Sequence, residues 1–295
     1  IIVNESIKFI EKIHSSESPF FIIIWDGSPH DPFLASEEDK KQFKSLDEES
    51  QNHYGELVAF DRSIGVLRKR IRDLGISENT LLWFCSDNGG LDKGISPSTV
   101  GGLKGFKGSM WEGGLRVPSI IEWPAMIKPK KTNYPASTMD VFPTIAEIVG
   151  LTESEMLNPI DGVSIVPVFN SKIKKRESKI PFRLKDKGAL IDNNIKLLAH
   201  SIKSEKFELY DLENDPKESI DISKTRPEIF EEMKKEYLVW NNSVDASLKG
   251  KDYPERKVLS QPKTRFWMGD ENYKIYLEEF ILRPEYERRI RKFYK

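Results

Sequence analysis

The residues best suited to chemistry lie between Asn79 and Pro124 of this 295-residue chain. A short apolar run, residues 81–84, leads into Asp87-Asn88-Gly89-Gly90. A carboxylate beside an amide carbonyl offers the hard oxygen atoms that Ca²⁺ and Mg²⁺ prefer, and glycine lets the backbone approach closely. The same four residues also suit an ordinary Asx turn. Because Ca²⁺ takes about six to eight oxygen ligands, the pattern indicates at most part of a metal site.

A second candidate is the glycine-punctuated loop 101–108, which contains Lys104 and Lys107. Backbone N–H groups and a lysine ammonium can together hold an oxyanion. The loop is not a P-loop, because no Ser or Thr follows Lys107. A flexible basic loop is the alternative. Just beyond it, Glu112 and Arg116 flank two glycines, and we expect each to form an internal ion pair that ties the loop to the next strand.

A third candidate is His30, which lies in a loop between Pro29 and Pro32. The two prolines restrict the backbone on either side of it. An imidazole near neutral pH can exchange a proton or donate a hydrogen bond to an anion. A structural hydrogen bond within the loop is the simpler role for a single histidine.

Alternating strand and helix patterns must position these groups. Residues 20–25 form a continuous apolar run that predicts a buried strand. Apolar residues at spacings of three and four predict a helix over 51–74, which Gly75 ends. A strand over 80–86 completes a βαβ unit, whose right-handed crossover predicts a parallel sheet, and 117–123 continues the alternation. Such a sheet would gather ligands at the carboxyl ends of its strands.

The second half of the chain has a different pattern. Residues 138–150 predict a helix that Thr138 caps and Gly150 stops. Three short strand patterns predict a smaller antiparallel sheet: residues 189–191, 195–199 and 207–212. Pro227 opens a further helix at its first positions, and a last helix is expected from Glu271 towards Arg291.

Composition excludes several classes of protein. The 47 acidic and 46 basic residues nearly cancel, which argues against duplex DNA or an anionic membrane as a partner. The single cysteine, Cys85, excludes an internal disulfide framework and a cysteine zinc cluster. No apolar run is long enough for a membrane span. Residues 1–16 have the pattern of an amphipathic helix and not of a signal peptide, and we expect the chain to be part of a longer protein.

Taken in order, these segments resemble the sulfatase family, including arylsulfatase and N-acetylgalactosamine-6-sulfatase-like members of the alkaline-phosphatase-like superfamily. The segments that match are PFFIIIW with SPHDPF, HYGELVAFDRSIGVLRKRIRDLGISENTLLWFCSDNGG, GFKGSMWEGGLRVPSIIEWP, MDVFPTIAEIVG, DGVSIVPVF and FELYDLENDPKES. WNNSVDASLKG resembles a tail of secreted polysaccharide and N-acetylgalactosamine-6-sulfatase-like members. No single motif is decisive, but the ordered set covers most of the chain and is specific.

The resemblance implies an α/β fold. It implies an alkaline-phosphatase-like, mostly parallel sheet with flanking helices, and a smaller C-terminal antiparallel sheet packed with a helix. Residues 1–165 would be the C-terminal portion of the catalytic domain, 166–242 a small α+β subdomain, and 243–295 a tail with a helix.

The resemblance also implies residue roles. Asp87 and Asn88 would be ligands of one Ca²⁺ ion. His30 would contact the sulfate and assist departure of the alcohol. Lys107 would bind the sulfate or the leaving-group oxygen, and Lys104 is a weaker candidate for that position. A cation and a lysine would neutralise the ester oxygens and the developing charge.

One part of the family pattern is missing. The family's nucleophile is a formylglycine made from Cys or Ser in a C/S-x-P-x-R motif. Cys85 is followed by Ser86 and Asp87, and Ser96-Pro97-Ser98 lacks the arginine. We therefore expect an N-terminally incomplete sulfatase, inactive alone, whose nucleophile and remaining Ca²⁺ ligands lie outside this chain.

The expected function is hydrolysis of sulfate esters, with sulfated sugars or polysaccharides as substrates. Two alternatives stay open: a phosphatase or phosphodiesterase of the same superfamily, and a non-catalytic remnant that only binds. Family analogy suggests a secreted, periplasmic or lysosomal location. The oligomeric state is not predicted.

Overall fold

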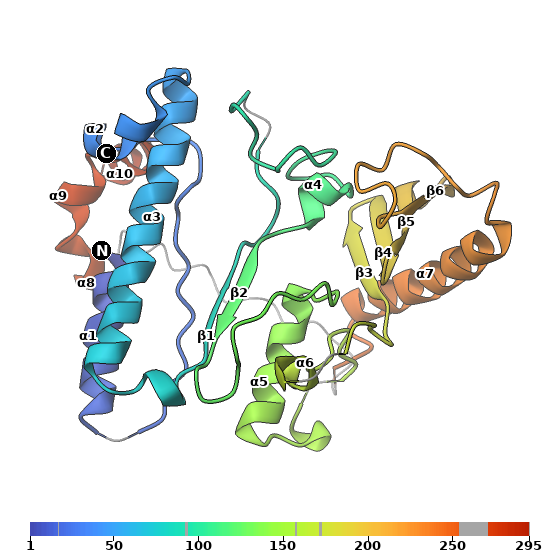
Figure 1. The fold of residues 1–295 in the computed structure, drawn as a ribbon, viewed down its shortest axis with the longest axis horizontal. Coiled ribbons are helices and arrows are strands. Elements are labelled where there is room, and N and C mark those ends of the chain that lie inside the picture. Colours follow the sequence, from blue (N-terminus) through green and yellow to red (C-terminus); the bar gives the residue numbers. More distant parts are fainter. Residues whose placement is uncertain (17, 92–93, 157, 171–172, 254–270, 295) are drawn as a thin grey trace. The chain divides into compact units, whose positions relative to one another are not determined.

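A computed structural model describes residues 1–16, 18–91, 94–156, 158–170, 173–253 and 271–294 (Figure 1). They divide into two compact units. The first unit comprises Ile1–Ser77, Gly94–Ser96 and the described residues from 271 onwards, and the second comprises the described residues within 78–93 and 97–258. The three segments expected from the sequence, 1–165, 166–242 and 243–295, stay a prediction.

The first unit is helical. Its helices are α1 (Ile2–His14), α2 (Glu37–Lys40), the 3₁₀ turn η1 (Lys41–Phe43), α3 (Glu48–Asp73), α8 (Glu271–Lys274), α9 (Leu277–Phe280) and α10 (Pro284–Phe293). The helix expected from Glu271 towards Arg291 is thus three short helices, and Pro284 starts the last of them. Proline cannot continue a preceding helix, because it lacks the N–H group.

Helix α3 confirms the long helix predicted from the sequence. It begins where Asp47 accepts a hydrogen bond of 2.9 Å from the N–H of Ser50. Gly75 follows its end with a left-handed φ of 71°. Leu67 and Ile71 are buried, and α3 packs against α1. This helix supports the loop that contains His30.

Residues 20–25 do not form the predicted strand. Phe21, Ile23 and Trp25 are exposed, Trp25 to 84%. A strand needs a neighbouring backbone to satisfy its N–H and C=O groups, and none of the described strands pairs with this segment. An apolar run supplies the propensity for a strand but not its partner.

The second unit contains two antiparallel sheets. β1 (Leu82–Cys85) pairs with β2 (Ser119–Glu122) in antiparallel register, so the described residues do not form the predicted parallel sheet. β3 (Ile180–Leu184), β4 (Lys187–Asp192), β5 (Ile195–Ser201) and β6 (Lys206–Asp211) form a meander in sequence order. This meander confirms the predicted C-terminal sheet and adds β3 to it.

Short helices complete the second unit: η2 (Ser77–Asn79, from the unit boundary), α4 (Glu112–Leu115), η3 (Thr138–Asp140), α5 (Val141–Val149), η4 (Glu153–Glu155), α6 (Val166–Asn170) and the long α7 (Pro227–Leu248). The helix predicted over 138–150 is formed by η3 and α5. Ser137, not Thr138, precedes its first turn, and the Ser137 N–H donates to Asp140 over 2.8 Å. Gly150 ends it with a φ of 76°.

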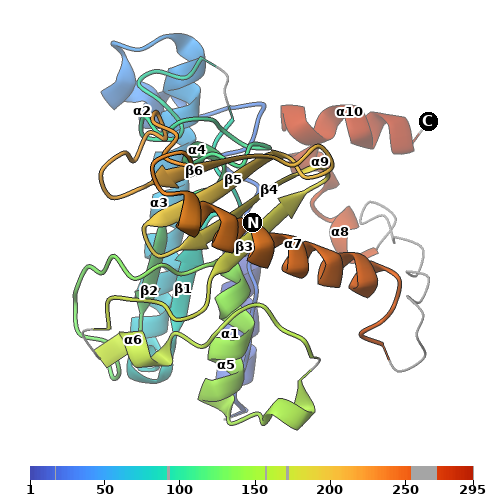
Figure 2. The same cartoon turned by 90° about the vertical axis from the view of Figure 1, so that its right-hand side faces the viewer.

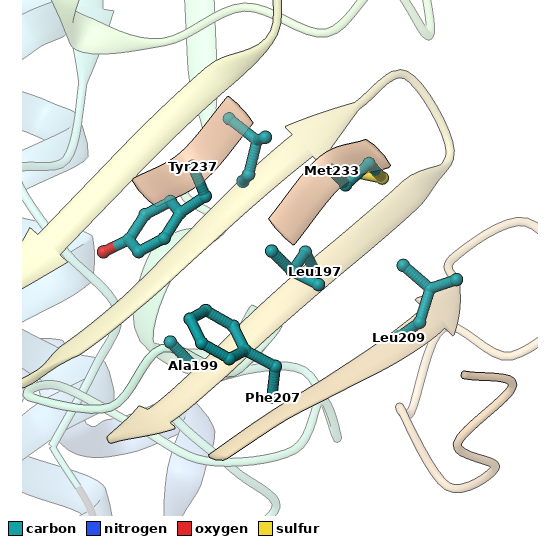
Figure 3. Packing of buried hydrophobic residues seen from close by; sticks show 7 residues of the cluster. Leu197, Ala199, Phe207, Leu209, Met233 and Tyr237 are labelled. Atoms are coloured by element: carbon teal, nitrogen blue, oxygen red, sulfur yellow. The ribbon is translucent and has the colours of Figure 1, made fainter. Parts of the chain in front are cut away.

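Helix α7 covers one face of the four-stranded sheet (Figure 2). Met233 and Tyr237 of α7 pack against Leu197, Phe207 and Leu209 of β5 and β6 (Figure 3). All of these side chains are less than a tenth exposed, so this is the main apolar core of the unit. Among the described helices, none is both long and apolar enough to cross a membrane.

Candidate functional site

The Asp-Asn turn, residues 86–90, follows β1 directly. The Ser86 hydroxyl donates to the Asn88 carbonyl over 2.9 Å, and the Asn88 amide nitrogen donates to the Asp87 carboxylate. Asp87 is exposed and Asn88 half-buried. The turn therefore presents a carboxylate and an amide side by side at the surface of the second unit.

The turn is joined to residues 101–116, which contain the glycine-punctuated loop 101–108 and α4. We call this longer segment the glycine loop. Two backbone hydrogen bonds form this connection: Lys107 N–H to Gly90 C=O at 2.9 Å and Gly89 N–H to Gly114 C=O at 3.0 Å. Within the loop, the Gly113 N–H donates to the Lys104 C=O over 2.8 Å. The structure thus brings the backbone of Lys107 beside the turn that contains Asp87 and Asn88, and a combined cation and anion site there stays a prediction.

Glycine is required where the two segments meet. A Cβ atom at Gly89 would lie 1.8 Å from the carbonyl oxygen of Gly113. A Cβ atom at Gly113 would lie 2.2 Å from the carbonyl oxygen of Gly105. Such contacts with backbone atoms cannot be relieved by moving a side chain, so only glycine permits this approach.

The two lysines of the loop differ in their surroundings. The Lys104 ammonium donates to the Glu218 carbonyl over 2.8 Å and lies 3.6 Å from the ring centroid of Trp111. By contrast, no hydrogen bond or ion pair within the described part of the chain engages the Lys107 ammonium. The Lys107 ammonium is therefore the more available of the two for a ligand, and the anion-binding role that the resemblance implies for it stays a prediction.

His30 lies in the first unit. Its Nδ1 donates to the Asp31 carbonyl over 2.8 Å, which leaves Nε2 for another partner. The chain after it is fixed to α3, because the N–H groups of Leu34 and Ala35 donate to side chains of that helix at 2.9 and 3.1 Å. His30 is exposed. Its membership of the same site as Asp87 and Lys107 stays a prediction.

The donor set of the Asp-Asn turn fits part of a calcium site. Asp87 and Asn88 offer the hard oxygens that Ca²⁺ selects. Within the residues that the structure describes, no group of three or more His, Cys, Asp or Glu side chains could hold a metal ion. The described residues therefore supply two candidate ligands and not a full coordination shell.

Cys85, at the end of β1, is a poor nucleophile. Burial raises the pKa of its thiol, and the charge of Asp87 adds to this effect. The thiol therefore stays protonated near neutral pH, whereas a reactive cysteine needs a lowered pKa. This agrees with the sequence, in which Cys85 lacks the motif of a modified cysteine.

Sequence reasoning missed a buried ion cluster behind the glycine loop. The Lys196 ammonium lies 3.0 Å from Glu112 Oε1 and 2.8 Å from Glu218 Oε1. The internal ion pair predicted for Glu112 is thus confirmed, and its partner is Lys196. Burial raises the pKa of Glu218, against the opposing charge of Lys196. The signal in the sequence that could have indicated this cluster was Lys196, a lysine inside the apolar run that forms β5.

Comparison with known families identifies the chain. The family model "Sulfatase" matches residues 1–151, and the model "N-sulphoglucosamine sulphohydrolase, C-terminal" matches residues 105–242. The chain belongs to the sulfatase family. The two matches overlap over the glycine loop, so the turn, the loop and the four-stranded sheet of this sulfatase chain all lie within family regions.

Individual relatives support the same assignment. A sulfatase of Formosa agariphila is 31% identical over 249 residues, 74% of this chain and 44% of that protein. Rat N-acetylgalactosamine-6-sulfatase is 34% identical over 173 residues, 57% of this chain and 31% of that protein. This sulfatase chain therefore spans less than half the length of these curated relatives.

Solved structures share the fold. The crystal structure of Ps i-CgsB is similar with a TM-score of 0.72 and 27% identity, covering 86% of this chain and 60% of that one. The same protein has been solved in complex with k-i-k-neocarrahexaose. The expected mixed α/β class is confirmed.

Proposed function

We propose that this sulfatase chain is the part of a sulfate-ester hydrolase that binds the sulfate group and contributes two ligands to a Ca²⁺ site. One observation supports the proposal above the others. In a member of the sulfatase family, the Lys107 N–H is bonded to Gly90, so a lysine whose ammonium has no hydrogen bond or ion pair among the described residues lies next to the Asp-Asn turn.

Each residue has a defined chemical part in this proposal. Lys107 binds an ester oxygen through its ammonium, and His30 Nε2 supplies a proton to the departing alcohol. Asp87 and Asn88 hold Ca²⁺, which neutralises sulfate oxygens when bound. The nucleophile, a formylglycine in this family, lies outside these 295 residues.

Sulfated saccharides are the proposed substrates. Ps i-CgsB, which is 27% identical, binds a neocarrahexaose, and the rat relative is named for a 6-sulfated amino sugar. Both names denote saccharides. We propose the same class for this chain.

The test compares sulfated and desulfated ligands. The chain is titrated by calorimetry with k-i-k-neocarrahexaose and with its desulfated counterpart. We expect the sulfated form to bind at least about tenfold more tightly, a difference of about 1.4 kcal/mol, and Lys107→Ala to remove this preference. Equal binding of the two ligands would overturn the proposal.

A turnover assay tests the position of the nucleophile separately. We expect the 295-residue chain to leave 4-nitrophenyl sulfate intact, because no covalent intermediate can form without a nucleophile. Release of 4-nitrophenol by the purified chain, absent from Lys107→Ala, would show that the nucleophile is within it.

A further inference from the structure

Glu218 contacts both ends of the glycine loop. Its Oε2 accepts a hydrogen bond from the Glu112 N–H over 2.7 Å, and its backbone carbonyl accepts from the Lys104 ammonium over 2.8 Å. Its other carboxylate oxygen pairs with Lys196 of β5. Because the Glu218 side chain is fully buried, its bonds to the Glu112 N–H and to Lys196 are shielded from competing water.

The backbone of Glu218 is held in an uncommon conformation. Its φ of 53° lies in the left-handed region, which non-glycine residues occupy rarely. The Asp215 carboxylate accepts from the N–H groups of Ser219 and Ile220 at 2.6 and 2.8 Å. The turn around Glu218 is therefore fixed by hydrogen bonds within its own segment, in addition to its contacts with the glycine loop.

The charges at this contact oppose separation of the loop from the sheet. The side chains of Lys196 and Glu218 are 0% exposed and that of Glu112 is 7% exposed. Moving the loop away would break the buried ion pair between Glu112 and Lys196 and the hydrogen bond from the Glu112 N–H to Glu218, and breaking a buried ion pair is among the costlier changes in a protein interior. Apolar packing acts in the same direction, because Met110 is buried against Leu198.

The contact continues to the candidate site through backbone bonds. Glu112 precedes Gly113 and Gly114, and Gly114 accepts the N–H of Gly89 in the Asp-Asn turn. Lys107 is bonded to Gly90 of the same turn. A shift of Glu112 would therefore move the loop that contains Lys107 relative to Asp87.

We propose that Glu218 is a positioning residue for the glycine loop: it fixes Glu112 and Lys104 so that Lys107 is held beside the Asp-Asn turn for sulfate binding. The part on sulfate binding rests on the proposed function. The inference gives the small C-terminal sheet a role in the site, although Glu218 itself contacts no substrate. It also assigns Lys104 to holding the loop.

The first experiment measures loop order without any ligand. Amide hydrogen exchange at Lys107 and Gly113 is followed in Glu218→Gln, with the Leu197 amide of β5 as an internal reference for the sheet. The matched control is Glu205→Gln: Glu205 also has a left-handed φ, 50°, and pairs with a lysine, but it is 58% exposed. Glutamine preserves size, removes the charge and leaves one acceptor oxygen where the carboxylate has two.

We expect exchange at Lys107 and Gly113 to accelerate at least about tenfold in Glu218→Gln, because local opening costs about 1.4 kcal/mol less. The Leu197 amide and the whole Glu205→Gln control should exchange as in the unaltered chain. Loop exchange that is unchanged, or that rises only in proportion to Leu197, would overturn the positioning role.

The second experiment tests whether Glu218 acts through Lys107. Binding of k-i-k-neocarrahexaose is measured for Glu218→Gln, Lys107→Ala and the double variant. We expect the glutamine change to weaken binding about tenfold alone and to have no further effect after Lys107→Ala, since residues in one network are not additive. Additive losses would overturn the inference.

Failure of the unaltered chain to prefer the sulfated ligand refutes the proposed function, and the exchange experiment then decides the positioning role alone.

Discussion

The backbone N–H of Lys107 donates a hydrogen bond to the carbonyl of Gly90 over 2.9 Å. This bond joins the proposed sulfate-binding lysine to the turn that contains Asp87 and Asn88. A ligand that bridges a bound cation and the lysine would therefore meet two groups whose backbones are held side by side. Preorganised charges of this kind stabilise an anion more than mobile ones do.

The two lysines of the glycine loop should respond differently to alanine. Lys107→Ala removes an ammonium that pairs with no group in the described part of the chain, so we expect affinity for k-i-k-neocarrahexaose to fall at least about tenfold with little change in stability. Lys104→Ala breaks the bond to Glu218 and the contact with Trp111, and should lower the free energy of unfolding by about 1 kcal/mol. Calorimetry and urea unfolding measure the two effects, and the reverse pattern would contradict the roles given to them.

The close approach of the turn and the loop predicts a strong effect of Gly89→Ala. The new Cβ would lie 1.8 Å from the Gly113 carbonyl oxygen, so we expect a loss of about 1–3 kcal/mol in the free energy of unfolding, together with loss of sulfate-dependent binding. Gly65→Ala is the control, because nothing lies within 4 Å of that position on α3. It should be neutral or stabilise by up to about 1 kcal/mol. Similar effects at both sites would refute the packing argument.

A buried ion pair should matter more than an exposed one of the same type. Arg176 donates to both carboxylate oxygens of Asp140 at 2.7 and 2.8 Å, and both side chains are at most 1% exposed. Arg176→Met leaves the Asp140 carboxylate buried without its ion-pair partner, so we expect the free energy of unfolding to fall by about 3–5 kcal/mol. Arg183→Met, whose partner Asp245 is 45% exposed, should cost at most about 1 kcal/mol. Equal costs in urea unfolding would contradict this distinction.

Buried tyrosines predict loss of stability at alkaline pH. Burial raises the pKa of Tyr237 from 10.0 to about 12, and burial together with Glu208 also raises that of Tyr210. Between pH 10.0 and about 12, Tyr237 keeps its proton in the folded chain and releases it in the unfolded chain. The free energy of unfolding therefore falls as pH rises through this window.

Tyr237→Phe should make this fall less steep, at the cost of the hydrogen bond of 3.2 Å from Tyr237 to the Phe182 carbonyl at neutral pH. Urea unfolding from neutral pH to about 11 measures the slope. An identical slope in the variant would show that Tyr237 does not contribute.

Elements with local signals were predictable from the sequence. The periodicity of α3 with Gly75, the stop at Gly150 and the proline at the start of α7 all act within a few residues. Strand pairing was less predictable. Residues 20–25 have strand composition but no partner among the described strands, and β3 was missed because it contains Pro181, which its edge position tolerates.

The site was predictable only in part, for the same reason. The Asp-Asn turn and the lysine loop have recognisable compositions, and their backbone contact follows from glycines at both ends. Glu112 and Glu218, however, are 106 residues apart, and no spacing rule connects them. Burial of Lys196 depends on the sheet that forms around it, so its role became visible only in the folded chain.

The coupling between Ca²⁺ and a sulfated ligand tests the central claim most directly. The affinity of the chain for k-i-k-neocarrahexaose is measured by calorimetry with and without Ca²⁺, for the unaltered chain and for Asp87→Ala, with the desulfated hexaose as control. We predict that Ca²⁺ strengthens binding at least about fivefold, a coupling of about 1 kcal/mol, and that Asp87→Ala abolishes this gain. An affinity that is independent of Ca²⁺, or a gain that survives in Asp87→Ala, would contradict the account.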